Sequence, residues 1–487
     1  MKLNHNLNIV KRVMLIYPPS NLYQRGEDRS QGNIEDATAT TIRACNDLGY
    51  ASSMLKKDDI DVFLKDYQTE NLSLDNLIND FKGYIPDVLF LSVTNATIFQ
   101  DIEVVNILKE IDKNLVVILK GAIFFDADEE LMQQLDLENI NYLIGGESDF
   151  IISDLIKAHF NHKKLDDIRG ILYKRDNQWI KTDFKTWEKN LDRLKFPDRD
   201  SMKNTLYVRP DTGEPQATIT TSRGCPAACI YCLTPHISGK AIRLRTPHNI
   251  FEELKESYTK HGIKNFFFKS DTFTIDRKWV TELCEYIIDS ELNGKIEWVA
   301  NSRVKPLEKE TLAIMKKAGC WLIAFGFESG SVETLKKIKK GATLEDNLKA
   351  ARFAKEVGMK IFGFYLIGLP WEDMSHLKDT QKLIYDIDAD FMEIHIATPY
   401  YGTELYEIVK EEGLIDETIL GKDYFNSPTI GTKYLSIEEV EKFKKELILK
   451  YHLRPSYIGK KLRDSTYNPK ILKNYFKFGS RLIKHNI

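Results

Sequence analysis

The chain alternates strand-like and helix-like segments in two successive series, and this alternation restricts its fold more than any other feature of the sequence. The first series contains four short β-branched or aliphatic runs, at residues 13–17, 88–93, 115–119 and 142–146. The second contains six, at residues 217–222, 266–270, 297–302, 321–327, 361–368 and 391–397. Strand, helix, strand in this order predicts parallel sheets covered by helices, so the expected fold class is α/β.

The two series and the segments around them predict four regions. We expect a doubly wound parallel sheet of the Rossmann type over 1–160, with its first helix near 36–48, and a linker subdomain over 161–215. A partial (β/α)6 barrel is expected over 216–430, followed by a basic helical C-terminal region over 431–487. In both sheet types ligands bind at the carboxyl ends of the strands.

Composition excludes several classes of protein. The chain has 487 residues, of which 43% are hydrophobic and 29% charged, as in a folded globular protein. Its formal net charge of −3 gives no overall attraction to nucleic acid. Six cysteines are too few for a disulfide-stapled secreted domain, so we expect reduced thiols. The apolar stretch at 13–17 is too short for a signal peptide, and no run approaches the ~18 apolar residues of a membrane span, so we expect a cytoplasmic protein.

Three cysteines gather in one short loop after the first strand of the second series. Cys225, Cys229 and Cys232 are separated by three and then two residues. Three thiolates can hold three irons of a four-iron cluster and leave the fourth iron open to another ligand. A structural zinc site is an alternative, with His236 as its fourth ligand, and a metal-free loop is another. The remaining cysteines are expected to be small core residues: Cys45, Cys284 and Cys320.

The loop resembles the signature of the radical S-adenosylmethionine (SAM) enzymes, in which an aromatic residue precedes the last cysteine, as Tyr231 does here. The resemblance extends over about residues 217–410. It includes the strand ends at 266–274, 298–303, 315–341, 368–370 and 399–403, with Tyr401 where many members carry Pro.

This resemblance implies a chemistry and a set of cofactor contacts. Cys225, Cys229 and Cys232 would bind a [4Fe-4S] cluster whose open iron chelates SAM. One electron would then cleave SAM to a 5′-deoxyadenosyl radical, which takes hydrogen from an unactivated carbon of the substrate.

The resemblance also implies roles for four other side chains. Arg303 suits the SAM carboxylate, Glu328 the ribose and Tyr231 the adenine, while Asp271 suits the substrate or the methionine amino group. Each of three charged residues has a structural alternative. Arg303 would pair with a neighbouring carboxylate, Glu328 would cap the following helix, and Asp271 would cap the turn before Arg277.

The first region resembles the cobalamin-binding subclass of these enzymes. Ser92 and Thr94 match its Ser-x-Thr element, and residues 146–147 match its late Gly-Glu. The resemblance implies a corrinoid site that includes Ser92, Thr94 and Gly121. The chain has no Asp-x-His-x-x-Gly, and Lys120 stands where the subclass has Gly. The alternative is a domain that keeps the fold without the cofactor.

The last 37 residues, 451–487, form a basic and aromatic tail with nine Lys or Arg residues and one acidic residue. Three interpretations are open: contact with a membrane surface, a helix packed on the barrel with its charges outward, or nucleic-acid binding. No nucleic-acid-binding module accompanies the tail, so we expect no nucleic-acid partner.

Taken with the resemblance, these features predict an enzyme that acts on an apolar or amphiphilic small molecule, a class that includes lipid-like substrates, with flavodoxin or ferredoxin as electron donor. The favoured reaction is cobalamin-dependent C-methylation. The alternatives are cobalamin-independent radical oxidation, cyclisation or carbon–carbon bond formation, and an iron–sulfur electron carrier. Glu393 and His395 share one face of the sixth strand, where they would contact substrate, fill the core or form an ion pair.

Overall fold

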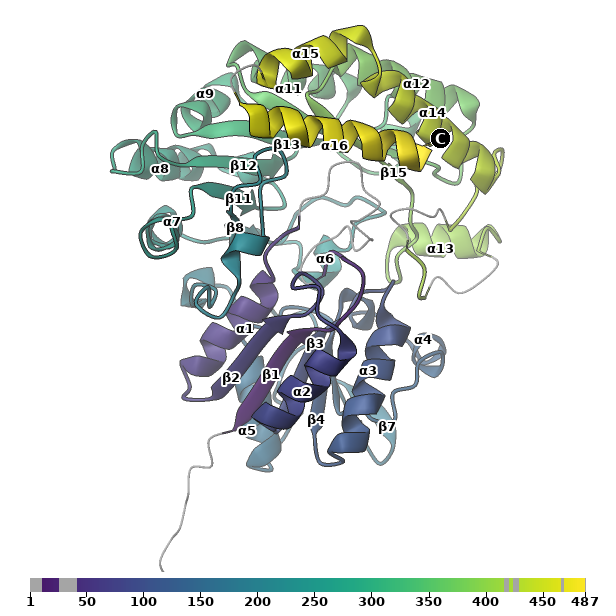
Figure 1. The fold of residues 1–487 in the computed structure, drawn as a ribbon. Helices are drawn as coiled ribbons and strands as arrows, with labels where there is room; N and C mark the ends of the chain where they lie inside the picture. Colours follow the sequence, from purple (N-terminus) through teal and green to yellow (C-terminus); the bar gives the residue numbers. More distant parts are fainter. Residues whose placement is uncertain (1–10, 26–41, 416–419, 424–428, 466–467, 487) are drawn as a thin grey trace, which may run out of the picture.

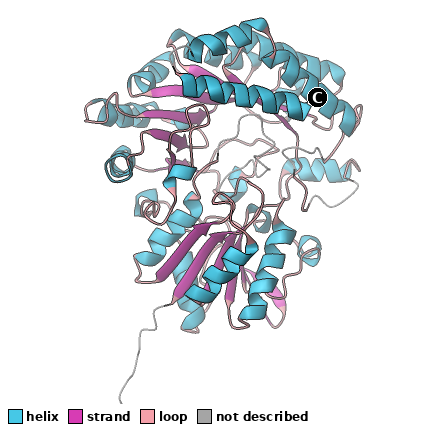
Figure 2. Ribbon diagram, viewed as in Figure 1, coloured by secondary structure: helices cyan, strands magenta, loops and turns pink. Residues whose placement is uncertain are grey.

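The computed structural model describes residues 11–25, 42–415, 420–423, 429–465 and 468–486. Two sheets, one from each half of the chain, form the centres of two lobes (Figure 1). Helices flank both sheets (Figure 2). The expected α/β class is confirmed.

The first lobe contains a seven-stranded sheet in the order β2-β1-β3-β4-β5-β6-β7. Its strands are β1 (Arg12–Tyr17), β2 (Asp61–Asp66), β3 (Val88–Ser92), β4 (Val116–Lys120), β5 (Tyr142–Ile144), β6 (Ile171–Arg175) and β7 (Gln178–Lys181). Its helices are α1 (Asn46–Lys56), α2 (Leu74–Tyr84), α3 (Ile98–Ile111), α4 (Glu129–Gln133) and α5 (Ile152–Phe160). Strands β1 to β5 are parallel, and β3 and β4 are buried along their whole length. This is the doubly wound sheet expected from the sequence.

Two details of this lobe differ from the prediction. The first described helix, α1, begins at Asn46 rather than near residue 36; residues 36–41 lie outside the described part of the chain. Strand β2 and helix α2 were not expected. The sequence of β2, DVFLKD, mixes charged and apolar residues because it lies at the sheet edge and is only partly buried.

Strands β6 and β7 pair with each other and, through β6, with β5. They therefore extend the first sheet into the stretch expected to be a linker subdomain. The four domain boundaries themselves stay predictions.

The second lobe contains a six-stranded parallel sheet whose strands follow one another in chain order. They are β8 (Gln216–Thr220), β11 (Asn265–Lys269), β12 (Glu297–Ser302), β13 (Cys320–Glu328), β14 (Lys360–Ile367) and β15 (Phe391–Ile396). The helices between them are α7 (Pro247–His261), α8 (Arg277–Ile288), α9 (Lys309–Lys317), α10 (Val332–Lys337), α11 (Leu344–Glu356) and α12 (Met374–Ile387). Helix α13 (Glu404–Glu411) follows β15. Parallel strands in chain order with intervening helices are the arrangement of a (β/α)6 sheet.

The C-terminal tail packs against this second sheet. Helices α14 (Ile437–His452), α15 (Pro455–Ser465) and α16 (Pro469–Asn486) make up the described part of the last region. At one end of α16, Asn474 Nδ2 donates to Asp211 O at 2.8 Å, just before β8. At the other end, Leu482 is buried with Val440 of α14. Helix α16 therefore spans the open side of the sheet between its edge strands (Figure 1).

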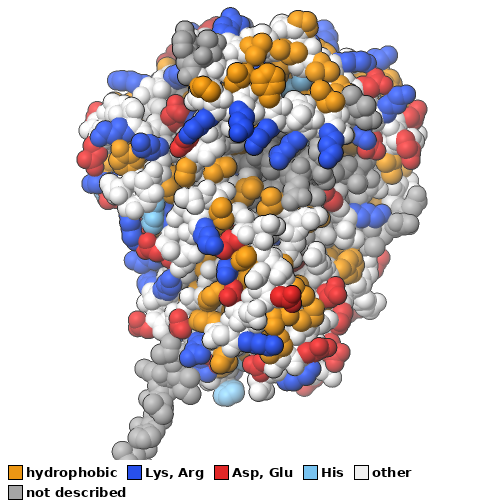
Figure 3. All heavy atoms as spheres, viewed as in Figure 1, with side chains coloured by type: hydrophobic (Ala, Val, Ile, Leu, Met, Phe, Trp, Pro, Cys, Tyr) orange, Lys and Arg blue, Asp and Glu red, His pale blue; other side chains and the backbone are white. Residues whose placement is uncertain are grey.

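Of the three interpretations of the tail, the structure supports the packed helix. Lys and Arg side chains form a row on the outer face over α16 (Figure 3). None of the described helices combines the length and the apolarity needed to cross a membrane.

Candidate functional site

The three clustered cysteines lie in a loop at the carboxyl end of β8. The loop follows β9 (Ser222–Arg223), which pairs with β10 (Arg243–Leu244), and it leads into α6 (Thr234–Ile237). Gly224, just before the first cysteine, has a φ of +89°, and a Cβ there would lie 2.2 Å from Ala241 O. Only glycine fits this position. Cys225 N then donates to Gly239 O at 3.1 Å, which holds the start of the loop.

The thiols suit a cluster better than a single ion. All three are free; Cys225 is buried, whereas Cys229 and Cys232 are partly exposed. Among the residues that the structure describes, no three His, Cys, Asp or Glu side chains converge on one metal position. A cuboidal cluster does not require this, because each thiolate binds a different iron. His236, the candidate fourth zinc ligand, instead bonds Asp126 Oδ2 through Nδ1 at 2.9 Å.

Arg303, Glu328 and Tyr231 lie together beside this loop. Arg303 Nη1 is 3.6 Å from Cys229 Sγ, so its guanidinium lies directly beside the cysteine loop. The Tyr231 hydroxyl hydrogen-bonds Glu328, and burial, with the Glu328 charge next in size, raises the tyrosine pKa well above its usual value. Tyr231 is therefore a hydrogen-bond donor. The structure thus brings three of the expected SAM contacts into one cluster.

Glu328 is held in an unusual conformation. It ends β13 with a φ of +62°, at a shift in register against β14 that follows Gly326. Left-handed backbone at a residue other than glycine is strained, and such strain concentrates at functional sites. Lys340 Nζ lies 2.5 Å from Glu328 Oε1, and both side chains are buried. This contact holds the carboxylate in place as a hydrogen-bond acceptor.

Lys340 also ties the cluster together through its backbone, because its carbonyl oxygen accepts a hydrogen bond from Arg303 Nη2. The sequence alone does not single out Lys340 as a site residue. It lies among Lys336, Lys337 and Lys339, and such a charged run is usually solvated. Only its burial against Glu328 distinguishes it from its neighbours.

Glu328 does not cap the following helix, since Ser331 caps α10 by accepting from Thr334 N. The turn at Phe273–Ile275, before Arg277, has Thr272 in its cap position, without a side-chain cap hydrogen bond. Asp271 follows β11 at the same strand-end edge.

Comparison with known proteins agrees with this geometry. Residues 219–384, which contain the three cysteines, Arg303 and Glu328, match the family model of the radical SAM superfamily. The protein is a radical SAM enzyme.

Relatives of this radical SAM enzyme align with much more of the chain than residues 219–384. An uncharacterized methyltransferase of Pyrococcus horikoshii is 27% identical over 451 residues, 93% of this chain and 94% of the relative. The solved structure of the cobalamin-dependent SAM radical enzyme OxsB has a TM-score of 0.72 at 16% identity, and covers 98% of this chain and 72% of its own. The radical SAM methyltransferase TsrM from Kitasatospora setae has a TM-score of 0.67 at 16% identity, and the match covers 84% of this chain and 77% of TsrM. The two structures share the fold of this enzyme.

The cysteine loop of the radical SAM enzyme faces the first lobe. Arg243 Nη1 donates to Glu147 Oε2 at 3.0 Å, and Arg223 Nη1 is 3.4 Å from the same oxygen. Both arginines belong to the short strands that flank the loop, while Glu147 follows β5. The Gly-Glu element of the first domain is therefore a clamp between the lobes. In Figure 1, α6 accordingly lies between the two sheets.

The residues expected at a corrinoid site lie together at the carboxyl ends of β3 and β4. The Ser92 hydroxyl donates to Asp47, and Lys120 Nζ lies 3.5 Å from the same carboxylate. Thr94 Oγ1 is 3.1 Å from a neighbouring hydroxyl, that of Thr97, and a Cβ on Gly121 would lie 2.8 Å from Val93 Cγ2. Ser92, Thr94 and Lys120 are buried, and each has a partner inside the protein. Lys120 is thus tied to Asp47.

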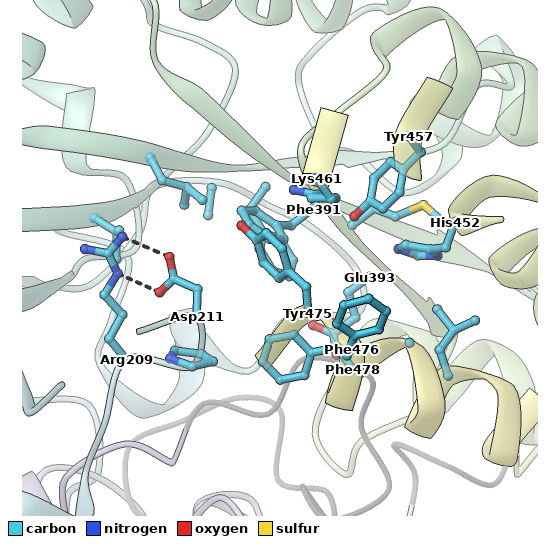
Figure 4. A pocket seen from close by; sticks show the side chains of 18 of the residues that line it. Arg209, Asp211, Phe391, Glu393, His452, Tyr457, Lys461, Tyr475, Phe476 and Phe478 are labelled. Carbon is cyan, nitrogen blue, oxygen red and sulfur yellow. Dashed lines mark hydrogen bonds and ion pairs between the residues drawn. The ribbon is translucent and has the colours of Figure 1, made fainter. Parts of the chain in front are cut away.

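The second sheet encloses a cavity of about 630 Å³, which helices α15 and α16 close from the side (Figure 4). Alternate residues of β12, β14 and β15 are only partly buried although the strands lie within the lobe, because these side chains line the cavity. Glu393 lines it, and its Oε2 lies 3.5 Å from His395 Nε2. The two side chains are therefore close together, and Glu393 faces the cavity.

Proposed function

We propose that this radical SAM enzyme methylates an unactivated carbon of an apolar or amphiphilic small molecule with the help of cobalamin. The observation that carries the proposal is the position of the cysteine loop. It lies where the carboxyl ends of both parallel sheets meet, with Glu147 on one side and Arg223 and Arg243 on the other. Ligands of both sheet types bind at these ends. A cofactor on the first sheet would therefore lie next to the cysteine loop.

On the barrel side, we propose that Cys225, Cys229 and Cys232 hold a [4Fe-4S] cluster. Arg303, which lies beside Cys229, would pair with the SAM carboxylate. Glu328, held in place by Lys340, would accept from the ribose hydroxyls. When bound, the cluster supplies the electron that splits SAM, and cobalamin supplies the methyl group.

Two further barrel residues would orient the cofactor and the substrate. Tyr231, whose hydroxyl is fixed on Glu328, would flank the adenine. Asp271, at the end of β11, would contact the methionine amino group or the substrate.

On the first-lobe side, we propose a corrinoid over the edge formed by Ser92, Thr94 and Gly121. Strand β1 lies between β2 and β3, so the chain changes direction at the β1/β3 crevice, the usual ligand position of such sheets. OxsB is described with aqua-cobalamin bound, and its fold covers nearly all of this chain. Because Ser92 and Thr94 are bonded internally, they would shape the edge through Asp47 and Thr97. An external flavodoxin or ferredoxin would deliver the electron.

The test is anaerobic reconstitution with iron, sulfide and cobalamin, followed by mass spectrometry. We expect about four irons per chain, a bound corrinoid, and 5′-deoxyadenosine and S-adenosylhomocysteine that rise together. Replacing any of the three cysteines by Ala should abolish deoxyadenosine formation.

The same experiment separates the alternatives. Deoxyadenosine without S-adenosylhomocysteine, and without corrinoid binding, would overturn methylation in favour of a cobalamin-independent radical reaction. A full cluster that never cleaves SAM would indicate an electron carrier.

A further inference from the structure

The cavity in the second lobe is mainly apolar and aromatic. Phe267, Phe362 and Phe391 line it from the strands, and Tyr475 and Phe478 line it from α16. Tyr475 and Phe478 of the C-terminal tail therefore face the cavity, whereas Phe476 beside them is 67% exposed (Figure 4). A cavity of this composition suits a substrate with an extended apolar or aromatic body.

One cation in this cavity lacks a hydrogen-bond partner. Lys461 of α15 is 8% exposed, and its Nζ forms no hydrogen bond with any residue that the structure describes. It lies 3.7 Å from the centre of the Phe391 ring, with the rings of Tyr457 and Tyr475 at 5.2 and 5.4 Å. Rings stabilise the cation in part, but they do not replace its lost hydrogen bonds. Burial accordingly lowers the pKa of Lys461 to about 7.

The carboxylates that act on Lys461 from a distance are already engaged. Asp390 pairs with Lys460 at 2.8 Å, and Asp464 pairs with Lys360 at 2.7 Å. Lysine is rarely buried without a partner, since it loses its hydration. An unpaired ammonium in a cavity therefore indicates that a ligand provides the partner.

The other charged side chains of the cavity have partners in the protein. Arg43 lies over the Phe267 ring, 4.3 Å from its centre. Arg209 and Asp211 form a two-point ion pair at 2.7 and 2.9 Å, drawn in Figure 4. His452 Nδ1 is 2.8 Å from Ile448 O, and burial lowers its pKa to about 4, so it is neutral near pH 7. These groups leave Lys461 as the cavity's anion site.

We propose that Lys461 binds the acidic group of an amphiphilic substrate whose apolar body lies in the barrel cavity. The shared chemistry is a carboxylate or phosphate monoester on an alkyl or aromatic body. This inference rests on the proposed function, because it names the substrate class of the same enzyme. It also orients the substrate. Lys461 lies at Phe391, where β15 begins, and the strand rises roughly 17 Å to Ile396. The acidic group is then remote from the reacting carbon at the strand ends.

The test uses two fluorescent probes with the same aromatic body: 1-anilinonaphthalene-8-sulfonate, which is anionic, and N-phenyl-1-naphthylamine, which is neutral. Wild-type protein should bind the anionic probe more tightly. In Lys461→Met its affinity should fall roughly tenfold or more, as loss of a charge-assisted hydrogen bond implies, while the neutral probe is unaffected. Lys477→Met, on the exposed face of α16, is the matched control and should change neither affinity. Equal effects on both probes, or none, overturn the proposal.

A competition on the wild-type protein gives the same answer without relying on the folding of a variant. Decanoate and monodecyl phosphate should displace the anionic probe, and the stronger of the two identifies the acidic group. Decanol should be at least roughly tenfold weaker; equal competition by decanol overturns the proposal. Probe binding requires neither SAM cleavage nor methyl transfer, so its failure leaves the proposed function intact. Conversely, loss of the proposed function through the cofactor assays leaves the anion site intact.

Discussion

Replacing Gly224 by Ala should prevent the cysteine loop from binding iron. Gly224 has a φ of +89°, where an alanine costs more than about 1 kcal/mol relative to glycine. Its Cβ would also lie 2.2 Å from Ala241 O and 3.0 Å from Ser238 O. Both neighbours are backbone atoms, so the backbone around Gly224 must move by about 1 Å to reach an ordinary contact distance. Metal–ligand distances tolerate only about 0.2 Å. Since Cys225 is the next residue, its thiol moves out of range.

The assay is iron and sulfide content after anaerobic reconstitution, together with the cluster's absorption spectrum. Gly224→Ala should bind far less iron than wild type. Gly262→Ala is the matched control, because Gly262 has a φ of +66° but nothing within 4 Å of its added Cβ. It should lose a little stability and keep its iron. A full cluster and a normal response to SAM in Gly224→Ala would refute the steric reasoning.

Three further predictions follow from other contacts. Lys340→Met removes the cation from buried Glu328, so SAM affinity should fall roughly tenfold with iron content unchanged; unaltered equilibrium binding would contradict the role of this pair. Glu147→Gln breaks the clamp to Arg243, so the free energy of unfolding should fall by about 3 kcal/mol or more, seen as a lower thermal midpoint and faster proteolysis between the lobes; an unchanged midpoint would contradict it. Burial raises the pKa of Glu372 from 4.5 to about 7, so its contribution to stability is complete below pH 4.5 and is lost as the pH rises through 7. In Glu372→Gln the thermal midpoint should depend less on pH between these two values. An unchanged dependence on pH would show that another group titrates.

Local sequence patterns were sufficient to predict an element where each residue's environment follows from its own segment. The run at 115–119 is apolar at every position, and that at 88–93 at every position but Ser92, because β3 and β4 are buried on both faces. The spacing of Cys225, Cys229 and Cys232 could be recognised directly, because a loop of eight residues keeps its thiols near one another whatever surrounds it.

Local patterns failed where the environment comes from a distant segment. Strand β2 has only three consecutive apolar residues, because it lies at the sheet edge and is partly buried. Helix α1 begins at Asn46, and Asn46 Nδ2 donates to Thr218 O of β8 at 2.7 Å, a contact across 172 positions of sequence. Neither feature has a local marker.

The sequence by itself determined the two series of parallel strands and the cluster-type loop, because periodicity and motif spacing are properties of short segments. Arg303 and Glu328 became candidates through the family resemblance. The tertiary structure alone decided which charges are buried. Lys340 and Lys461 belong to charged segments that resemble solvated surface, yet one is paired with Glu328 and the other faces the cavity. The same holds for the tail, whose aromatic residues acquire a role only when α16 crosses the open side of the barrel. Burial is set by the contacts of the whole chain, and contacts between residues far apart in sequence have no local signature.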